Sequence, residues 1–488
     1  MKKAICIVIA VGMISTLCSC AANPNKDIVT GKGDGVFETR VLETSPENHN
    51  PSETQTMQHA EEFSSTDESV LFRLNIDEEV TAANMPVVEV VPRFVTEEEA
   101  EKIAHILFGD VVFTETRPRL VDLYSKDEIL ERLNRWEQMT DEETMKRLMD
   151  PSDDLQSEID LVERFIEDYT KMLETAPDED LNTPCQWTYK NSRYYWVSAD
   201  EVEKGSHDLD EISADCYIDH IPFQFSILKR DDNDFKACSI SAYIASPVGP
   251  DFYDKRFFQD ILLRTEKPTQ EQICAATEKA QSILDQIQLG DWMIDQVDVV
   301  GEELYTIKVS AVPAFNGVAA IWKAAGEREE YTSYYEVTYA ELAFSADGQL
   351  VDFNLNSPLE ITNIVNDNVA ILSLEELMEK ARTYLEHSDI YDYAERIGYN
   401  RTTLGTYKKK GVNLICSVDG ISMEYNLTRI QKPNADNTYY YIPAISLTGN
   451  INLCFSRKGA EDEVETYENI TLVVLNAVDG TVVNEVNS

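Results

Sequence analysis

The residue types that most often carry enzyme chemistry are scattered along this chain without a catalytic spacing. Its six histidines form no His-Glu-x-x-His or His-x-His pattern, so no metal site is predicted. Ser226 and Lys229 have the Ser-x-x-Lys spacing of penicillin-recognising enzymes, but they end a strand-like run, whereas that motif must open a helix. Asp231–Asp234 could bind Ca²⁺ but lacks the glycine and distal glutamate of an EF-hand loop, so a polar turn is expected. We therefore predict no catalytic residue, no metal and no cofactor.

Aromatic clusters are the better candidates for contacting a ligand, because their rings could stack on sugars or peptides. Strands also favour aromatic residues for packing alone, which is the alternative explanation. A hydrolase with a carboxylate pair stays open as well, since 89 acidic residues would conceal such a pair. The candidate ligand contacts are Tyr194, Tyr195, Trp196, Tyr334, Tyr335, Tyr439 and Tyr440.

Cysteine use leaves the redox state open. Buried free thiols are the interpretation we favour, although an even count outside the cell would allow disulfides. Cys416 and Cys454 are the pair expected to bond if any does, because both lie in strand-like runs of one C-terminal segment. The cysteines after residue 20 are Cys185, Cys216, Cys238, Cys274, Cys416 and Cys454.

Three predicted helices, each opened by the same N-terminal capping pattern, form the framework for the candidate ligand contacts. Each begins with a capping box, at Thr96, Thr269 and Ser373, and continues with an apolar stripe at helical spacing. Alternating residues from Val70 and the run Val87–Val91 predict strands before the first helix. Strand-like runs follow the three helices at Tyr217–Leu228, Tyr335–Phe344 and Tyr441–Phe455.

The tyrosine pairs recur at a nearly constant distance from these helix starts. Tyr334 and Tyr439 come 65 and 66 residues after theirs, whereas Tyr194 comes 98 after its own. Two helix-period stretches within 126–174 account for the excess, so we predict an inserted helical hairpin there. The fold class is predicted as α+β, with three tandem helix-on-antiparallel-sheet modules. Their predicted bounds are 63–260 with the insert 126–174, then 261–360, then 361–488.

The N-terminus has the make-up of an export signal. Two lysines precede the apolar run Ala4–Ile14, which is shorter than the roughly 20 residues of a membrane crossing. The following Leu-Cys-Ser-Cys resembles the lipobox of bacterial lipoproteins, which implies removal of residues 1–19 and acylation of Cys20. An ordinary cleaved signal is the alternative. Residues 20–62 are polar and small, so we expect a tether, with the protein lipid-anchored at the outer face of the cytoplasmic membrane.

Net charge restricts the partners. The chain has 42 basic and 89 acidic residues, a net charge of −47. Nucleic acids and anionic lipid headgroups would be repelled, so the membrane is contacted only through the attached lipid. With 43% hydrophobic residues the chain still buries cores, and a basic or neutral protein partner is expected.

Several stretches resemble known families. Leu475–Val482, which contains the predicted turn Asp479-Gly480 into the last strand, resembles PepSY-type modules and the accessory proteins that restrain cell-wall sensor kinases from outside the membrane. Asp34–Phe37, Met85–Val91 and Tyr441–Ala444 resemble a family of uncharacterised lipoproteins of Gram-positive gut bacteria, over most of the mature chain. That family has no assigned catalytic residue to carry over.

The resemblance implies an extracytoplasmic binding or regulatory protein without catalytic activity. Three similar units would also give long exposed edges and two grooves between units, which suit a protein or peptide partner at the cell surface by strand addition. A cell-wall or glycan hydrolase with an unrecognised carboxylate site is the alternative.

Overall fold

A computed structural model gives the fold, in two compact units that share the chain. The first unit combines Met1–Val91, Ala314–Ser333 and Ile361–Ser488; the second combines Pro92–Pro313 and Tyr334–Glu360. The structure describes residues 54–81, 85–116, 124–149, 154–178, 182–191, 209–231, 236–245, 262–263, 266–301, 304–320, 338–399, 401–432, 437–459 and 461–483.

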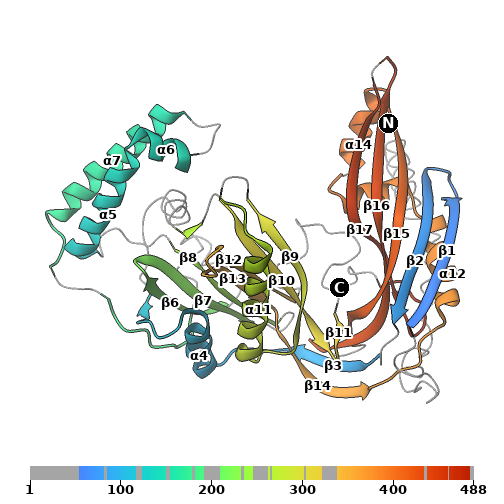
Figure 1. Cartoon of the computed structure of the whole chain (residues 1–488), viewed down its shortest axis with the longest axis horizontal. Helices are drawn as coiled ribbons and strands as arrows, with labels where there is room; N and C mark the ends of the chain where they lie inside the picture. Colours follow the sequence, from blue (N-terminus) through green and yellow to red (C-terminus); the bar gives the residue numbers. More distant parts are fainter. Residues whose placement is uncertain are drawn as a thin grey trace, which may run out of the picture. The chain divides into compact units, whose positions relative to one another are not determined.

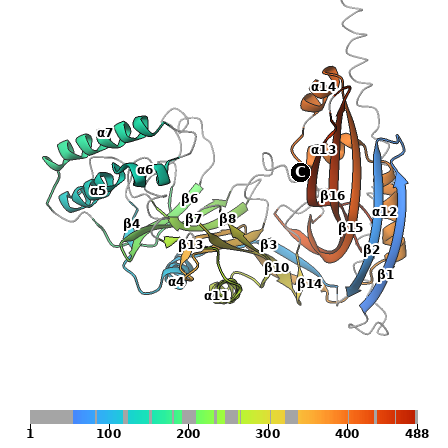
Figure 2. The same cartoon turned by 45° about the horizontal axis from the view of Figure 1, so that its top comes forward.

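The second unit is built on an antiparallel sheet with two helices on one face (Figures 1 and 2). β9 pairs with β10, and the order continues β10-β12-β13-β8-β7-β6, with the short β4 and β5 both on β6. The strands are β4 (Thr114–Glu115), β5 (Lys190–Asn191), β6 (Leu209–Ile218), β7 (Ile221–Asp231), β8 (Lys236–Ile244), β9 (Trp292–Val300), β10 (Thr306–Phe315), β12 (Tyr339–Phe344) and β13 (Leu350–Asn356). The helices are α4 (Glu97–Phe108) and α11 (Gln270–Ile287).

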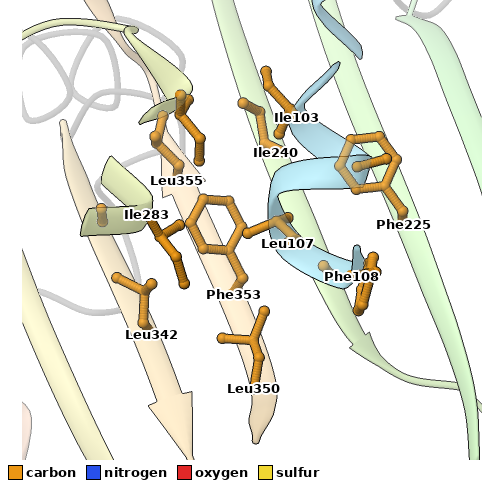
Figure 3. Packing of buried hydrophobic residues seen from close by; sticks show 14 of the residues in the cluster. Ile103, Leu107, Phe108, Phe225, Ile240, Ile283, Leu342, Leu350, Phe353 and Leu355 are labelled. Carbon is orange, nitrogen blue, oxygen red and sulfur yellow. The ribbon is translucent and has the colours of Figure 1, made fainter. Parts of the chain in front are cut away.

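The core of this unit lies between the helices and the sheet. Both helices start with the predicted capping boxes, at Thr96 and Thr269, and their apolar stripes are buried. Figure 3 shows this packing, with side chains of both helices directed at the strands. The labelled members are Ile103, Leu107 and Phe108 of α4, Ile283 of α11, and Phe225, Ile240, Leu342, Leu350, Phe353 and Leu355 of the sheet.

The predicted insert is helical and has a core of its own. Ser125 caps the first of its helices with a capping box. Arg132, 2% exposed, lies between the rings of Tyr124 and Tyr169 and donates to the Tyr169 hydroxyl at 3.3 Å. The helices are α5 (Lys126–Met139), α6 (Glu142–Leu148) and α7 (Leu155–Leu173), all within residues 126–174, and they number three where a hairpin of two was predicted.

The first unit holds the remaining sheet, in the order β1-β2-β15-β16-β3-β14. Residues 439–441 of β16 pair with β3, and residues 444–455 of β16 pair with β17. β2 pairs with β15 in parallel. The strands are β1 (Thr54–Ser64), β2 (Val70–Thr81), β3 (Val87–Pro92), β14 (Leu359–Asn366), β15 (Val412–Gln431), β16 (Tyr439–Arg457) and β17 (Glu463–Asn476), and β11 (Val318–Ala319) pairs with the end of β10. The helices are α12 (Leu374–Glu386), capped by Ser373 as predicted, α13 (Ile390–Arg396) and α14 (Arg401–Lys409).

The α+β class is therefore confirmed, whereas the strand partnerships differ from the predicted modules. The first two helices share one continuous sheet, because β8 pairs with β13 and neither strand is left as an open edge. Strands β2 and β3, assigned to the first module, lie in the sheet of the third helix. The burial of Phe72 favours this position for β2. Its ring is fully buried and contacts Tyr393 of α13, with ring centroids 5.6 Å apart. The tether predicted to residue 62 is also too long, because β1 begins at Thr54.

Candidate functional site

Most of the predicted site residues lie outside the described part of the chain. Nothing in the structure bears on acylation of Cys20 or on ligand contact by the first two aromatic clusters. The residues concerned are Cys20, Tyr194, Tyr195, Trp196, Tyr334 and Tyr335.

The third tyrosine pair is described, and its two rings lie on opposite faces of β16. Arg429 lies over the ring of Tyr439, 4.8 Å from its centroid, and the Lys432 ammonium lies 5.6 Å from the centroid of Tyr440. Lys432 also forms an ion pair with Glu89 of β3, the residue directly opposite Tyr440. Hydrogen bonding to Lys432 lowers the pKa of the Glu89 carboxyl. The pair therefore does not form one stacking platform for a sugar, since adjacent strand residues alternate between faces.

Cys416 and Cys454, the pair that we expected to bond if any did, form no disulfide, in line with the interpretation of free thiols that we favoured. Both cysteines are free, and Cys416 is opposite Leu453 while Cys454 is opposite Ile415. The two thiols therefore point to opposite faces of the sheet, because directly paired residues share a face. Burial raises the pKa of Cys416 to about 12, which keeps it a protonated core thiol rather than a nucleophile.

A surface that the sequence did not reveal lies on the face of β15, β16 and β17 away from the helices. Ile415, Cys454 and Val464 are paired in one row across the three strands. Ile415 and Val464 are 59% and 58% exposed, so this row presents two aliphatic side chains to solvent. In the next row the Thr466 hydroxyl donates to Asn452 at 2.9 Å, so polar side chains border the apolar row.

The outer edge of β17 borders this row. In the described chain β17 pairs only with β16 along residues 463–470, whereas its last residues also contact residues 481–483. Five carboxylates surround the open edge, compared with two basic residues in the preceding turn, Arg457 and Lys458. The acidic residues are Glu461, Asp462, Glu463, Glu465 and Glu468. We refer to residues 463–470 with Ile415 and Cys454 as the β17 edge surface.

Aromatic packing holds the other face of this edge in place. The hydroxyls of Tyr467 and Tyr399 both donate to Glu465, the former at 2.7 Å. Burial, together with these hydrogen bonds to a carboxylate, raises the pKa of Tyr399, so its hydroxyl stays a donor. Phe455 lies 5.9 Å from the Tyr399 ring and completes the cluster. These contacts connect Glu465 and Tyr467 of β17 to Tyr399, which lies between α13 and α14.

Neither a metal centre nor a membrane span is found among the described residues. They contain no group of three or more metal-ligating side chains. Within the same ranges, no helix combines the length and the apolar character needed to cross a bilayer. The β17 edge surface was missed because strand pairing, and not local composition, decides which strand is left at the edge.

Comparisons with known proteins add no function. No protein-family model matches the chain, and no curated protein matches it. Among solved structures, the crystal structure of an uncharacterized protein from Eubacterium rectale is similar over 92% of this chain and 98% of its own. The sequence identity is 10% and the TM-score 0.36.

Proposed function

We propose that this protein is a lipid-anchored, extracytoplasmic binding or regulatory protein that acts without catalysis. Its partner would be a protein at the cell surface, one extended segment of which pairs with the outer edge of β17. The observation that carries the proposal is the open edge at residues 463–470 beside the exposed aliphatic row. A strand that adds to an edge gains main-chain hydrogen bonds, and its alternate side chains reach one face of the sheet.

The chemistry of the edge selects the partner. On the partner's added strand, one set of alternate side chains would cover Ile415 and Val464, which are more than half exposed. Basic side chains would lie near the carboxylates that surround the edge, such as Glu463 and Glu468. The same carboxylates keep two copies of the chain from pairing edge to edge, because like charges would meet. A basic or neutral segment with alternating apolar residues therefore fits, whereas an acidic one does not.

The lipid anchor and the envelope partner rest on sequence resemblance. The lipobox-like ending at Cys20 supports attachment to the membrane, and Leu475–Val482 resembles a segment of sensor-kinase accessory proteins. A fold-level likeness does not establish a function, so the partner must be found by experiment.

In-cell photo-crosslinking tests the proposal. A photoreactive residue at position 464 should capture a partner, whereas one at Glu379, an exposed position on α12, should not. A crosslinker at position 415 should capture the partner about tenfold less, or weaker still, in Val464→Lys. The new lysine would repel the basic segment of the partner, because both are positively charged. Val464→Thr is the matched control, because it keeps the β-branched shape without the charge. Equal capture from positions 464 and 379 would contradict binding at the β17 edge surface. Release of glycan or peptide fragments from peptidoglycan by the purified protein would favour the hydrolase instead.

A further inference from the structure

A pocket in the second unit lies where the short strands β4 and β5 meet β6. Its side chains include Glu115 and Lys190 from the short strands, Glu211 and Ser213 from β6, and Cys185 and Trp187 from the segment before β5. Glu211 and Ser213 lie on the face of β6 away from α4, because Ile212 and Ala214, which alternate with them, belong to the core.

Glu211 is the unusual member of this pocket. It is 9% exposed, and its Oε2 has no hydrogen-bond partner in the part of the chain that the structure describes. Lys190 is directly opposite in the strand register, yet its ammonium binds Glu115 at 2.9 Å instead. Buried carboxylates are normally paired or hydrogen-bonded, because an unpaired charge in a low-dielectric site is costly. An unpartnered oxygen that lines a pocket therefore indicates a missing ligand.

Trp187 supplies an independent sign of a functional site. Its φ is +50°, in the left-handed region that bulky residues rarely adopt. Such a conformation costs on the order of 1–3 kcal/mol and persists where surrounding contacts enforce it, often at ligand sites. Here the indole packs on Phe113 and Phe225, with centroids 5.2 and 5.9 Å away, while the Trp187 amide donates to the Cys185 sulfur at 3.4 Å. Phe113 and Phe225 belong to the core between α4 and the sheet, so the indole packs on that side while the residue itself lines the pocket.

Charge decides which ligand fits. Glu115 and Lys190 neutralise each other, which leaves the charge of Glu211 uncompensated. Burial raises the pKa of the Cys185 thiol, so this side chain adds no second negative charge. A cation with N–H donors, such as an ammonium group, would complete the carboxylate. A metal ion is a poorer match, because the described residues hold no cluster of three ligating groups.

We propose that this pocket binds the ammonium group of a small primary amine, with Glu211 as its counter-ion. The site is separate from the β17 edge surface and does not depend on it. Only the ammonium and a few methylene groups fit, because the open pocket is small.

Calorimetric titration of the full-length protein with n-propylammonium tests this proposal. Binding with a Kd on the order of 1 mM is expected, and n-propanol, which has the same shape without the charge, should not bind. Glu211→Gln should weaken binding at least tenfold. Asp210→Asn is the matched control, because it removes the adjacent carboxylate of β6, which lies on the other face, and should leave affinity unchanged.

A second measurement covers the case in which Glu211→Gln fails to fold. In the unmodified protein, n-propylammonium should shift the side-chain carboxyl carbon signal of Glu211, and n-propanol should not. Equal affinity in Glu211→Gln and the unmodified protein, or no heat and no carboxyl shift up to about 100 mM amine, would overturn the proposal.

Discussion

Glu211→Gln should change how the stability of the second unit depends on pH. The free energy of unfolding of the variant should exceed that of the unmodified protein by more at neutral pH than in acid. Burial raises the pKa of Glu211 from 4.5 to about 6. The folded state therefore holds this proton more tightly than the unfolded state does. Its contribution to stability is fully present below pH 4.5, declines between pH 4.5 and about 6, and is lost above that.

The magnitude follows from the pKa difference between the two states. A difference of about 1.5 pKa units, at 1.36 kcal/mol per unit, corresponds to about 2 kcal/mol in the free energy of unfolding. Glutamine keeps the shape of the side chain but cannot ionise, so the variant loses this pH dependence. Between pH 4 and 7 the unmodified protein should thus lose about 2 kcal/mol relative to Glu211→Gln.

Urea denaturation at a series of pH values measures this difference. Hydrogen exchange of β6 and β7 amides should be followed alongside, since a chain with two units need not unfold in one step. Asp210→Asn controls for the loss of a carboxylate from the same strand. A constant difference between the unmodified protein and Glu211→Gln across pH 4 to 7 would refute the assignment of a buried, unpaired carboxyl.

Three further predictions concern other parts of the chain. Cys20→Ala should move the protein from the membrane pellet to the soluble or unprocessed fraction, and unchanged lipid labelling would contradict the proposed anchor. Arg132→Ala should destabilise the inserted helices by about 2 kcal/mol, since it removes a buried guanidinium that packs on two tyrosine rings. Arg164→Ala, at an exposed position on α7, serves as the comparison, and chemical denaturation measures the loss. In the native protein a thiol reagent should modify the exposed Cys274 first and leave the buried Cys416 unmodified until unfolding, and a disulfide-linked Cys416 would be inconsistent with the structure.

The helices could be predicted because their signals are local. Each capping box occupies four consecutive residues, and the buried stripe that follows repeats at helical spacing, so Thr96, Thr269 and Ser373 mark the true starts. The insert was found in the same way, from two helix-period stretches that lengthen the first interval between a helix start and its tyrosine pair.

Strand partners could not be predicted, because pairing joins residues far apart in sequence. β2 alternates clearly, yet nothing in its residues indicates that Val70 pairs with Cys416 in parallel. The placement of Cys416 and Cys454 could not be predicted for the same reason, since a register difference of one residue places the two thiols on opposite faces.

The two sites were missed for related reasons. Glu211 is one acidic residue among 89, and only its burial between β5 and β7 distinguishes it. The edge of β17 is open because no other strand covers residues 463–470 in the described sheet, which is a property of the topology and not of those eight residues.

Amide hydrogen exchange at residues 463–470 tests the central claim most directly, with the native protein compared free and in complex with the crosslinked partner. Outward-facing amides of this edge should exchange rapidly in the free protein, because they lack a strand partner. Addition of a strand should protect alternate amides along the edge, as hydrogen bonds to the new strand form. Protection confined to other regions, with rapid exchange retained at 463–470, would contradict strand addition at β17.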